Sequence, residues 1–382
     1  MDKTKLIETV LSRGVEEIID RSSLEKKLAS EKTLRVKLGI DPTSPDIHLG
    51  HTVVLRKLRQ FQDLGHKVVL IIGDFTAQIG DPSGKSETRP ALSKDEVERN
   101  FKKYLKQAGK VIDIKKAEVF YNSAWYEKGI QPFLKLTRSA TIQQVLKRDD
   151  FEKRMRGGND ISVLEILYPL FQGYDSVMVK ADVELGGTDQ KFNLLMGRRV
   201  QRSFGMPEQD VLTVPLIEGT DGVRKMSKSY GNYIALDDEP NDMFGKIMAV
   251  PDGLVAKYFT TLTDIDAPKN LGARDAKMLL AETIISEYHS SKDAKGAREE
   301  WIRVFSKKET PDDVAELKVS KKISVIDLLI KAGIESKSEA RRLIEQGGVT
   351  IGDETKKDPA EVLNLRSGTI LKIGKRRFFR IS

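Results

Sequence analysis

The chain of 382 residues lacks cysteine, has only four histidines, and contains no apolar run near the roughly 18 residues needed to cross a bilayer. The missing cysteine excludes disulfides, thiol catalysis and thiolate metal sites. The N-terminal stretch alternates charged and apolar residues and carries Asp2 and Glu8, which is typical of neither a secretory signal nor a transit peptide. We therefore expect a cytoplasmic protein with no membrane partner, divided into two or three domains.

Positive charge is unevenly distributed along the chain. Residues 317–382 carry 15 Lys and Arg against 8 Asp and Glu, which accounts for +7 of the net charge of +8. A basic segment after a near-neutral body indicates binding to a polyanion, with RNA or DNA the obvious ligand. The alternative interpretation is a basic surface that serves solubility alone.

Alternating strand and helix patterns from residue 35 to about 222 predict a doubly wound α/β fold with a Rossmann-like parallel sheet. RVKLGI (35–40) and KVVLIIGDF (67–75) have strand patterns, and the helix predicted between them is capped by Asp46 and ends at Gly65. Such a βαβ unit implies parallel strands. Further strands are expected within residues 116–122, 177–187 and 210–219.

The pattern predicts four segments along the chain. They are an N-terminal helical segment (1–34), a catalytic domain (35–235) with a helical insertion (about 123–175) and a loop (222–231), an α-helical domain (236–318), and a small basic α+β domain (319–382). In the last, Ser324 is expected to cap a helix ending at Gly333, and Ser338 to begin a second helix. Strand-like VTI and GTILKIGKRRFFRI follow.

Two of the four histidines lie three apart in HLGH (48–51), within the first turn of a predicted helix and on one face. A helix N-terminus that follows a parallel strand favours anions, and two imidazoles can donate hydrogen bonds to phosphate oxygens. Gly50 between them lets a flat ligand approach the backbone. The alternatives are a zinc pair, which needs further ligands that the neighbouring sequence lacks, or chance surface histidines.

A second stretch, GTDGVRKMSKSYGN (219–232), follows a predicted strand and predicts a mobile loop with Lys225 and Lys228 three apart. Lysine is a compact charge on a flexible stem, which suits it to follow a phosphate whose charge grows during a reaction. A lysine-rich loop alone is usually a solvated turn. Together with HLGH in one α/β domain it indicates phosphate chemistry.

A third pattern places Tyr168, Gln172 and Asp175 at i, i+4 and i+7, on one face of a predicted helix. That face of an ordinary amphipathic helix would be apolar. Gln and Asp on it therefore predict that it lines a polar pocket. Pro169 inside the helix should remove one backbone hydrogen bond.

HLGH and KMSKS together resemble the two signatures of class I aminoacyl-tRNA synthetases. Over essentially its full length the chain is similar to the tyrosyl-tRNA synthetases of bacterial type, and GDPSGK (80–85), GGTDQ (186–190) and YPLFQGYD (168–175) resemble their substrate-binding motifs. The C-terminal segment resembles the small RNA-binding domain of ribosomal small-subunit protein four.

The resemblance implies that L-tyrosine and ATP form tyrosyl-adenylate with release of pyrophosphate, and that the tyrosyl group then passes to tRNA(Tyr). It also implies a homodimer. Mg²⁺ is expected to accompany ATP rather than occupy a protein cage, and neither a protein metal site nor a tightly bound prosthetic group is expected.

Residue roles follow from the same resemblance. The ATP phosphates and the leaving pyrophosphate are assigned to His48, His51, Thr43, Lys85, Arg89, Lys225 and Lys228. Tyrosine is assigned to Asp81, Tyr168 and Gln172 at its ammonium, to Asp175 at its hydroxyl, and further to Gln190 and Lys37. ATP is also assigned to Asp41, Gly50, Gly187, Asp189, Met226 and Ser227. RNA is assigned to Arg341, Arg342, Lys375, Arg376 and Arg377.

The sequence departs from the family pattern at two places. Lys37 stands where many members carry a tyrosine that contacts the substrate hydroxyl, and GGTDQKFN replaces the common GGSDQWGN. Three alternatives stay open. A tryptophanyl enzyme is disfavoured by the Tyr/Gln/Asp helix, and a noncatalytic RNA-binding protein on a synthetase scaffold is disfavoured by HLGH and KMSKS. A small-molecule nucleotidyltransferase gives no reason for the basic C-terminal domain.

Overall fold

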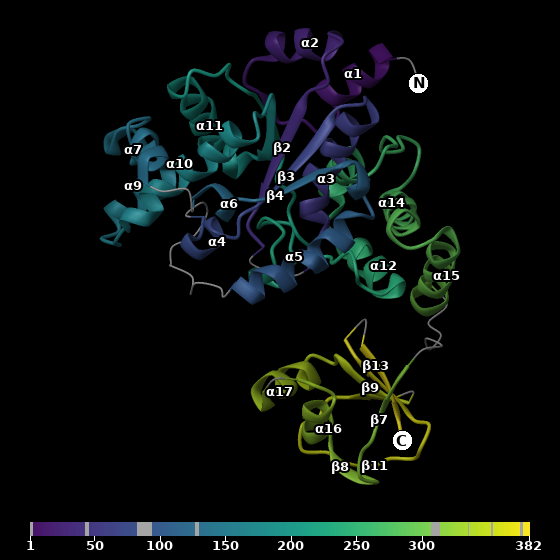
Figure 1. The fold of residues 1–382 in the computed structure, drawn as a ribbon. Helices are drawn as coiled ribbons and strands as arrows, with labels where there is room; N and C mark the ends of the chain where they lie inside the picture. Colours follow the sequence, from purple (N-terminus) through teal and green to yellow (C-terminus); the bar gives the residue numbers. More distant parts are fainter. Residues whose placement is uncertain are drawn as a thin grey trace. The chain divides into compact units, whose positions relative to one another are not determined.

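Parallel strands form the centre of the larger part of the molecule, with helices on both faces (Figure 1). The computed structural model describes residues 3–42, 46–81, 94–126, 130–306, 314–334, 336–352, 354–374 and 377–382. These divide into two compact units, residues 1–239 with 246–290, and residues 240–245 with 291–382. Each unit is described by itself below.

The sheet of the first unit has the strand order β1-β6-β5-β2-β3-β4. Its strands are β1 (Glu17–Ile18), β2 (Arg35–Ile40), β3 (Lys67–Ile72), β4 (Glu118–Tyr121), β5 (Val183–Gly187) and β6 (Asp210–Val214). All neighbours are parallel except β1, which pairs antiparallel with β6. Along the chain, β2 is followed by β3 and β4 on one side of it, and β5 then pairs with β2 on its other side. A crevice at the carboxyl ends of β2 and β5 is where such sheets bind ligands.

The predicted βαβ unit is confirmed, with helix α3 (Leu49–Asp63) between β2 and β3. Gly65 follows this helix with φ +87°, the left-handed conformation expected at its end. The predicted cap is wrong, because the helix begins two residues later and His48 caps it instead of Asp46. The prediction of a wholly helical N-terminus is also incomplete, since β1 separates α1 (Lys3–Ser12) from α2 (Arg21–Ala29).

The expected helical stretch after β4 is confirmed as α6 (Ser123–Tyr126), α7 (Ile130–Thr137), α8 (Ile142–Val145), α9 (Asp149–Arg156) and α10 (Val163–Met178). Ser162 and Glu165 form a capping box at the start of α10, which continues through Pro169. Helix α11 (Lys191–Ser203) packs closely on α10. A Cβ on Gly173 would come within 2.8 Å of the Val200 side chain, so glycine permits this approach.

The remaining helices of the first unit are α4 (Thr76–Ile79), α5 (Lys94–Ala108), α13 (Val255–Leu262) and α14 (Ala273–Tyr288). Short 3-10 turns lie at Ile114–Lys116, Thr188–Gln190, Lys228–Tyr230 and Asp252–Leu254. Helix α12 (Pro240–Ala249) begins in the segment that groups with the second unit, which also holds α15 (Ser291–Trp301) and a π-helical turn (Ile302–Ser306). The helical pattern expected for residues 236–316 is thus confirmed through residue 306, whereas residues 315 and 316 belong to a strand.

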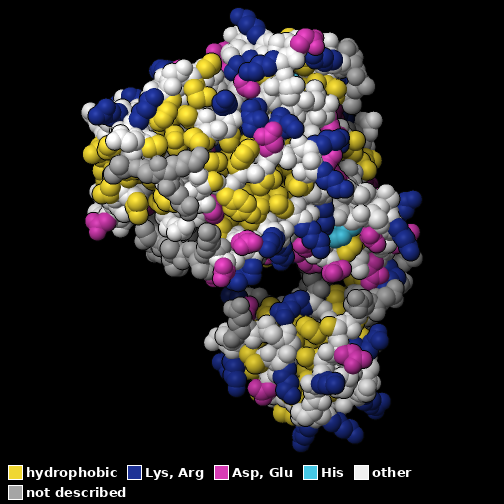
Figure 2. Space-filling model, in the orientation of Figure 1, with side chains coloured by type: hydrophobic (Ala, Val, Ile, Leu, Met, Phe, Trp, Pro, Cys, Tyr) yellow, Lys and Arg dark blue, Asp and Glu magenta, His cyan; other side chains and the backbone are white. Residues whose placement is uncertain are grey.

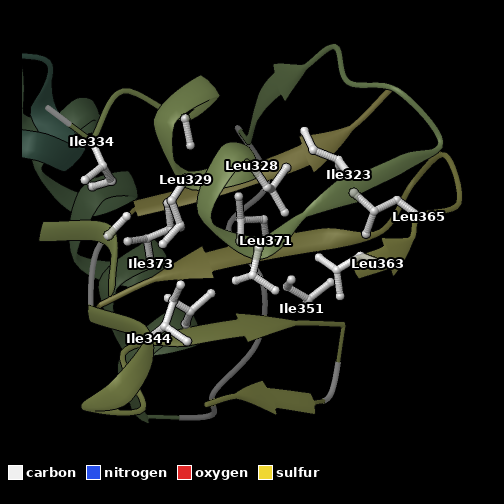
Figure 3. Packing of buried hydrophobic residues seen from close by; sticks show 14 of the residues in the cluster. Ile323, Leu328, Leu329, Ile334, Ile344, Ile351, Leu363, Leu365, Leu371 and Ile373 are labelled. Carbon is white, nitrogen blue, oxygen red and sulfur yellow. The ribbon is translucent and has the colours of Figure 1, made fainter. Parts of the chain in front are cut away.

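The C-terminal part of the chain has a five-stranded sheet ordered β10-β9-β12-β13-β7 and a two-stranded sheet of β11 and β8. Its strands are β7 (Ala315–Leu317), β8 (Lys322–Ser324), β9 (Val349–Ile351), β10 (Glu354–Lys356), β11 (Val362–Asn364), β12 (Ile370–Ile373) and β13 (Arg377–Ile381). Helices α16 (Val325–Lys331) and α17 (Lys337–Glu345) cover a core of aliphatic side chains from helices and strands, including Leu328, Ile344 and Leu371 (Figure 3).

The predicted cap of α16 is confirmed, and the predicted cap of α17 is wrong. Ser324 caps α16, and Gly333 follows it with φ +82°, both as expected. The second cap is Ser336 rather than Ser338, because the Ser336 hydroxyl accepts the Glu339 amide. Two serines two residues apart offer similar caps, and the sequence alone did not distinguish them.

Candidate active site

The two histidines of HLGH begin α3, at the carboxyl edge of the sheet. Nδ1 of His48 accepts the Gly50 amide at 3.2 Å, and Nδ1 of His51 accepts the His48 amide at 3.2 Å. Each neutral ring therefore carries its proton on Nε2. Their ring centroids are 3.8 Å apart. The pair thus closes the end of the helix with one nitrogen and presents N–H donors with the other.

Both imidazoles are held neutral. Burial, with the nearby His51, Lys228 and Lys225, lowers the pKa of His48 to about 2. Crowding by protein and the charge of Lys228 lower the pKa of His51 to about 4, although its side chain stays accessible to solvent. Gly50 makes room for this arrangement, since a Cβ there would come within 2.9 Å of the His48 ring. Its role in the structure is therefore to admit the imidazole.

Each of the two lysines of KMSKS forms an ion pair with a carboxylate in the same region. Lys228 Nζ lies 2.7 Å from Asp46, and Lys225 Nζ lies 2.9 Å from Asp189. Lys103 from α5 also pairs with Asp46. Although partial burial opposes it, hydrogen bonds from Lys103 and Lys228 lower the pKa of Asp46 overall. An ion pair between Lys228 of KMSKS and Asp46, which lies two residues before HLGH, thus joins segments 182 residues apart.

Met226 and Ser227 fix the loop that carries these lysines. Met226 is buried and its amide donates to Ile217 O at 2.8 Å, while the Ser227 amide donates to the Asn232 side chain at 2.8 Å. Gly187 lies at the end of β5, where a Cβ would come within 2.8 Å of the Asp189 carboxylate. Asp189 is therefore held between the strand end and Lys225.

Asp175 lies at the centre of a buried polar cluster. Its Oδ1 accepts Trp125 Nε1 at 3.0 Å and the Tyr126 hydroxyl at 2.9 Å, and its Oδ2 accepts Asn122 Nδ2 at 3.3 Å. Burial raises the pKa of Asp175 to about 6, against the opposing effects of Lys37 and these three donors. A carboxylate oxygen accepts two hydrogen bonds, so Oδ2 can take a further donor from a ligand.

The polarity of the hydrogen bonds around Tyr168 and Gln172 favours a cationic ligand. The Tyr168 hydroxyl donates to Asp41 Oδ2 at 2.8 Å, which leaves its oxygen to act as an acceptor. Nε2 of Gln172 donates to Glu184 at 3.3 Å. The Oε1 atom of Gln172 therefore points away from Glu184 and provides a second acceptor. Asp81 adds a carboxylate and is itself held by Gln190 Nε2 at 2.6 Å. Three acceptors of this kind match an ammonium group.

Asp41 links these groups to the sheet. Its Oδ1 accepts the Thr76 hydroxyl at 2.8 Å, and Thr76 in turn accepts Asn122 Nδ2 at 3.0 Å. Burial raises the pKa of Asp41 to about 7, opposed by the bonds from Thr76 and Tyr168. The bonds therefore run from Tyr168 through Asp41, Thr76 and Asn122 to Asp175.

Lys37 is fully buried, and its charge is matched by Glu184 at 2.8 Å. Its Nζ also donates to Gln172 O and Ser176 Oγ, each at 2.8 Å. Lys37 therefore directs its charge and its hydrogen bonds to other residues of the protein.

Some sequence-predicted residues lie outside the described residues, namely Thr43, Lys85, Arg89, Lys375 and Arg376. Of the predicted RNA-binding residues, Arg341 and Arg342 are exposed on α17, whereas Arg377 donates to Ala332 O at 2.6 Å beyond the end of α16. In the part of the chain that the structure describes, no group of three His, Cys, Asp or Glu side chains could hold a metal ion.

Sequence reasoning missed the residues that surround Asp175 and Lys37. Asn122 and Trp125 had weak signals, since one directly follows a strand and the other is one of only two tryptophans. Glu184 had a clearer one. It is a charge inside a buried strand, as is Lys37, and opposite charges on neighbouring buried strands predict a pair.

Comparison with known proteins places the chain among aminoacyl-tRNA synthetases. The family model for class I tRNA synthetases (W and Y) matches residues 29–306, and the S4 domain model matches residues 326–366. A tyrosine–tRNA ligase from Thermotoga maritima is 49% identical, covering 98% of this chain and 96% of its own. The tyrosine–tRNA ligase from Aquifex aeolicus is 47% identical, covering 97% of each chain.

Solved structures show the same fold. A mitochondrial tyrosyl-tRNA synthetase from Aspergillus nidulans, truncated at its C-terminus, matches with a TM-score of 0.65 and 22% identity, over 78% of this chain and 94% of its own. The Archaeoglobus fulgidus tyrosyl-tRNA synthetase complexed with L-tyrosine matches with a TM-score of 0.63 and 22% identity, over 78% of this chain and 100% of its own. Within the described ranges, every helix is too short or too polar to cross a membrane.

Proposed function

The chain belongs to the class I tyrosyl-tRNA synthetases, and from this premise we propose how its residues carry out the reaction. The enzyme activates L-tyrosine with ATP to tyrosyl-adenylate and pyrophosphate, then transfers the tyrosyl group to the 3′-terminal adenosine of tRNA(Tyr) for translation. We assign the reaction to the cytoplasm, where translation takes place. One observation chiefly supports the proposed residue roles. Hydrogen bonds within the protein leave acceptors at Tyr168 and Gln172 and N–H donors at His48 and His51.

Tyrosine binds along α10 in this proposal. Its ammonium donates to Asp81, Tyr168 and Gln172, and its hydroxyl donates to Asp175 Oδ2, which has room for a further donor. Gln190 supports Asp81 through their 2.6 Å hydrogen bond. Lys37 is proposed to support this pocket indirectly, since its Nζ donates to Gln172 O. An indole, whose single N–H is placed differently from a phenolic hydroxyl, fits this pattern less well.

ATP binds at the start of α3. His48 and His51 donate from Nε2 to its phosphates without adding a fixed charge, and the helix N-terminus favours the anion. Gly50, Gly187, Asp189, Met226 and Ser227 shape the nucleotide side of the site, and Asp41 lies between nucleotide and amino acid. Thr43, Lys85 and Arg89, from segments outside the described residues, are proposed to join the phosphates.

Catalysis then consists of positioning and charge stabilisation. The tyrosine carboxylate attacks the α-phosphate, and the charge that develops on the departing pyrophosphate is met by Lys225 and Lys228. Mg²⁺ is proposed to arrive with ATP and to neutralise phosphate charge. Lys225 and Lys228, which pair with Asp189 and Asp46, are proposed to leave these carboxylates for the stronger charge of the phosphates.

Pyrophosphate exchange with each amino acid in turn tests this function. Exchange should require tyrosine, and tryptophan should not replace it. Exchange that depended on tryptophan would overturn the assignment. Binding of tRNA without exchange for any amino acid would instead favour a noncatalytic RNA-binding protein.

The small C-terminal domain is proposed to hold the tRNA backbone through Arg341 and Arg342 on α17 and Arg377 on β13, together with Lys375 and Arg376, which lie outside the described residues. We expect Arg341→Glu with Arg342→Glu to weaken tRNA charging and to lower the salt dependence of tRNA affinity by a slope of about one per lost phosphate contact. Exchange, which needs no tRNA, should be unchanged in the same protein. Unaltered charging would contradict the RNA role.

We also propose a homodimer, through an apolar face of the helices that follow β4. Figure 2 shows hydrophobic side chains gathered on the side where α7 and α9 lie in Figure 1. Its large exposed side chains are Leu134, Ile142, Met155, Val163 and Leu164. Ile142, at 65% exposed, and Val163, at 72%, belong to this group of exposed apolar side chains, and a patch of such side chains marks an interaction surface.

Val163→Asp tests this face, because a charge in an apolar interface opposes association. Sedimentation should show a dimer for the unaltered chain and mostly monomer for the variant. Val362→Asp is the matched control, since Val362 is 55% exposed but lies on β11 of the C-terminal domain. A monomeric unaltered chain, or equal effects of both variants, would reject the proposed interface.

A further inference from the structure

A buried ion pair lies behind the proposed tyrosine pocket, and none of the steps above uses it. Lys37 on β2 and Glu184 on β5 are paired in register on neighbouring strands. Both side chains are fully buried and their charged atoms are 2.8 Å apart. Burying two charges is expensive, and well-packed apolar residues would often be at least as stable. Stability is therefore a weak explanation for this pair.

The ammonium of Lys37 is fully engaged. It has three protons, and its three acceptors are Gln172 O, Ser176 Oγ and Glu184 Oε1, each at 2.8 Å. Two of these acceptors lie on the turn of α10 that carries Asp175. Lys37 thus fixes this turn against the sheet and meets the substrate only through its neighbours.

Glu184 fixes the same two residues of this turn through their side chains. It accepts Gln172 Nε2 at 3.3 Å and Ser176 Oγ at 3.1 Å, and it also pairs with Gln209. A Cβ on Gly197 would come within 2.9 Å of the carboxylate, so α11 leaves space for it. The bond from Gln172 Nε2 decides which end of that amide faces the pocket.

The charge of Lys37 also acts on Asp175. Burial raises the pKa of Asp175 to about 6, and Lys37 is the strongest influence in the opposite direction. The titratable or charged groups that face this carboxylate are Lys37 from β2, Asp41 after β2, Tyr126 from α6 and Tyr168 from α10, with Glu184 of β5 behind Lys37.

We propose that the Lys37–Glu184 pair is a positioning and specificity element for tyrosine, which orients Gln172 toward the substrate ammonium and keeps Asp175 charged for the substrate hydroxyl. The inference rests on the proposed tyrosine pocket. The substrate hydroxyl is then recognised by one carboxylate, Asp175, whose charge is maintained by Lys37.

Opposite charge changes provide the test. Tyrosine affinity is measured directly by calorimetry between pH 5.5 and 8.5 for Lys37→Met and Glu184→Gln. A protonated Asp175 accepts the hydroxyl poorly, so affinity should fall as pH drops through its pKa. Lys37→Met removes a positive charge and should move this midpoint up by about one unit, which lowers affinity about fivefold at pH 6. Glu184→Gln removes a negative charge and should move it down.

The matched controls are Arg154→Met and Glu165→Gln, which break another buried ion pair made by α10. They should lower thermal stability and leave the midpoint unchanged. Unmoved midpoints in folded Lys37→Met and Glu184→Gln proteins, or shifts in the same direction, would overturn the inference. If Lys37→Met fails to fold, Glu184→Gln and the neutral double variant still decide it. An unaltered chain that binds no tyrosine would overturn the proposed function instead.

Discussion

Asp175→Asn is expected to lower kcat/KM for tyrosine in pyrophosphate exchange by about a thousandfold. The amide removes the charge that receives the substrate hydroxyl, and a hydrogen bond to a charged group contributes about 1.5–3 kcal/mol. The amide oxygen keeps the hydrogen bonds from Trp125 and Tyr126, so the new NH₂ group takes the place of Oδ2. The hydroxyl of bound tyrosine then becomes a buried donor without an acceptor, which costs about 1–3 kcal/mol more and is specific to tyrosine. A sum near 4 kcal/mol corresponds to about a thousandfold in rate.

Phenylalanine serves as the internal control for Asp175→Asn. It lacks the hydroxyl, so its slow exchange should hardly change in the variant, and discrimination between the two amino acids should collapse. An equal loss with both substrates would show that Asp175 maintains the pocket without recognising the hydroxyl.

Lys228→Ala is expected to lower kcat for exchange by about a hundredfold with little change in tyrosine affinity. Removing one preorganised donor to developing charge typically costs 10²–10³ in kcat. The free energy is expected to be lost in the transition state, because the proposed tyrosine contacts are made by α10 and Asp81 and do not include Lys228. Single-turnover formation of the adenylate measures the step, and equilibrium tyrosine binding measures the ground state.

Lys103→Ala is the matched control for Lys228→Ala. Lys103 pairs with the same Asp46 carboxylate, but from α5. Its loss should leave adenylate formation near the level of the unaltered enzyme. Comparable losses in both variants would indicate that Asp46 neutralisation, rather than contact with pyrophosphate, explains the effect of Lys228.

Much of the fold could be predicted because its signals are local. The buried strand KVVLII, the periodic helix after HLGH and the left-handed Gly65 each follow from neighbouring residues. The cap of that helix could not, since Asp46 is a better cap by type than histidine. In the folded protein Lys228 and Lys103 engage Asp46, and these partners come from distant parts of the chain.

The site was predicted in the same uneven way. The face formed by Tyr168, Gln172 and Asp175 followed from helical spacing, and all three are buried on α10 as expected. Their hydrogen-bond polarity did not follow, because it depends on Asp41 and Glu184 from two other elements. Which of several possible partners a polar group chooses is decided by the packing of the sheet.

The double use of the histidine rings limits which residues can replace them. In its proposed role, the side chain at position 48 accepts the Gly50 amide proton at the start of α3 and also donates toward a phosphate. Asparagine has both an acceptor and a donor on a short stem, whereas glutamate and aspartate keep the cap and lose the donor. We therefore infer that asparagine at position 48 would be tolerated better than aspartate or glutamate, because it keeps one edge that accepts and one edge that donates.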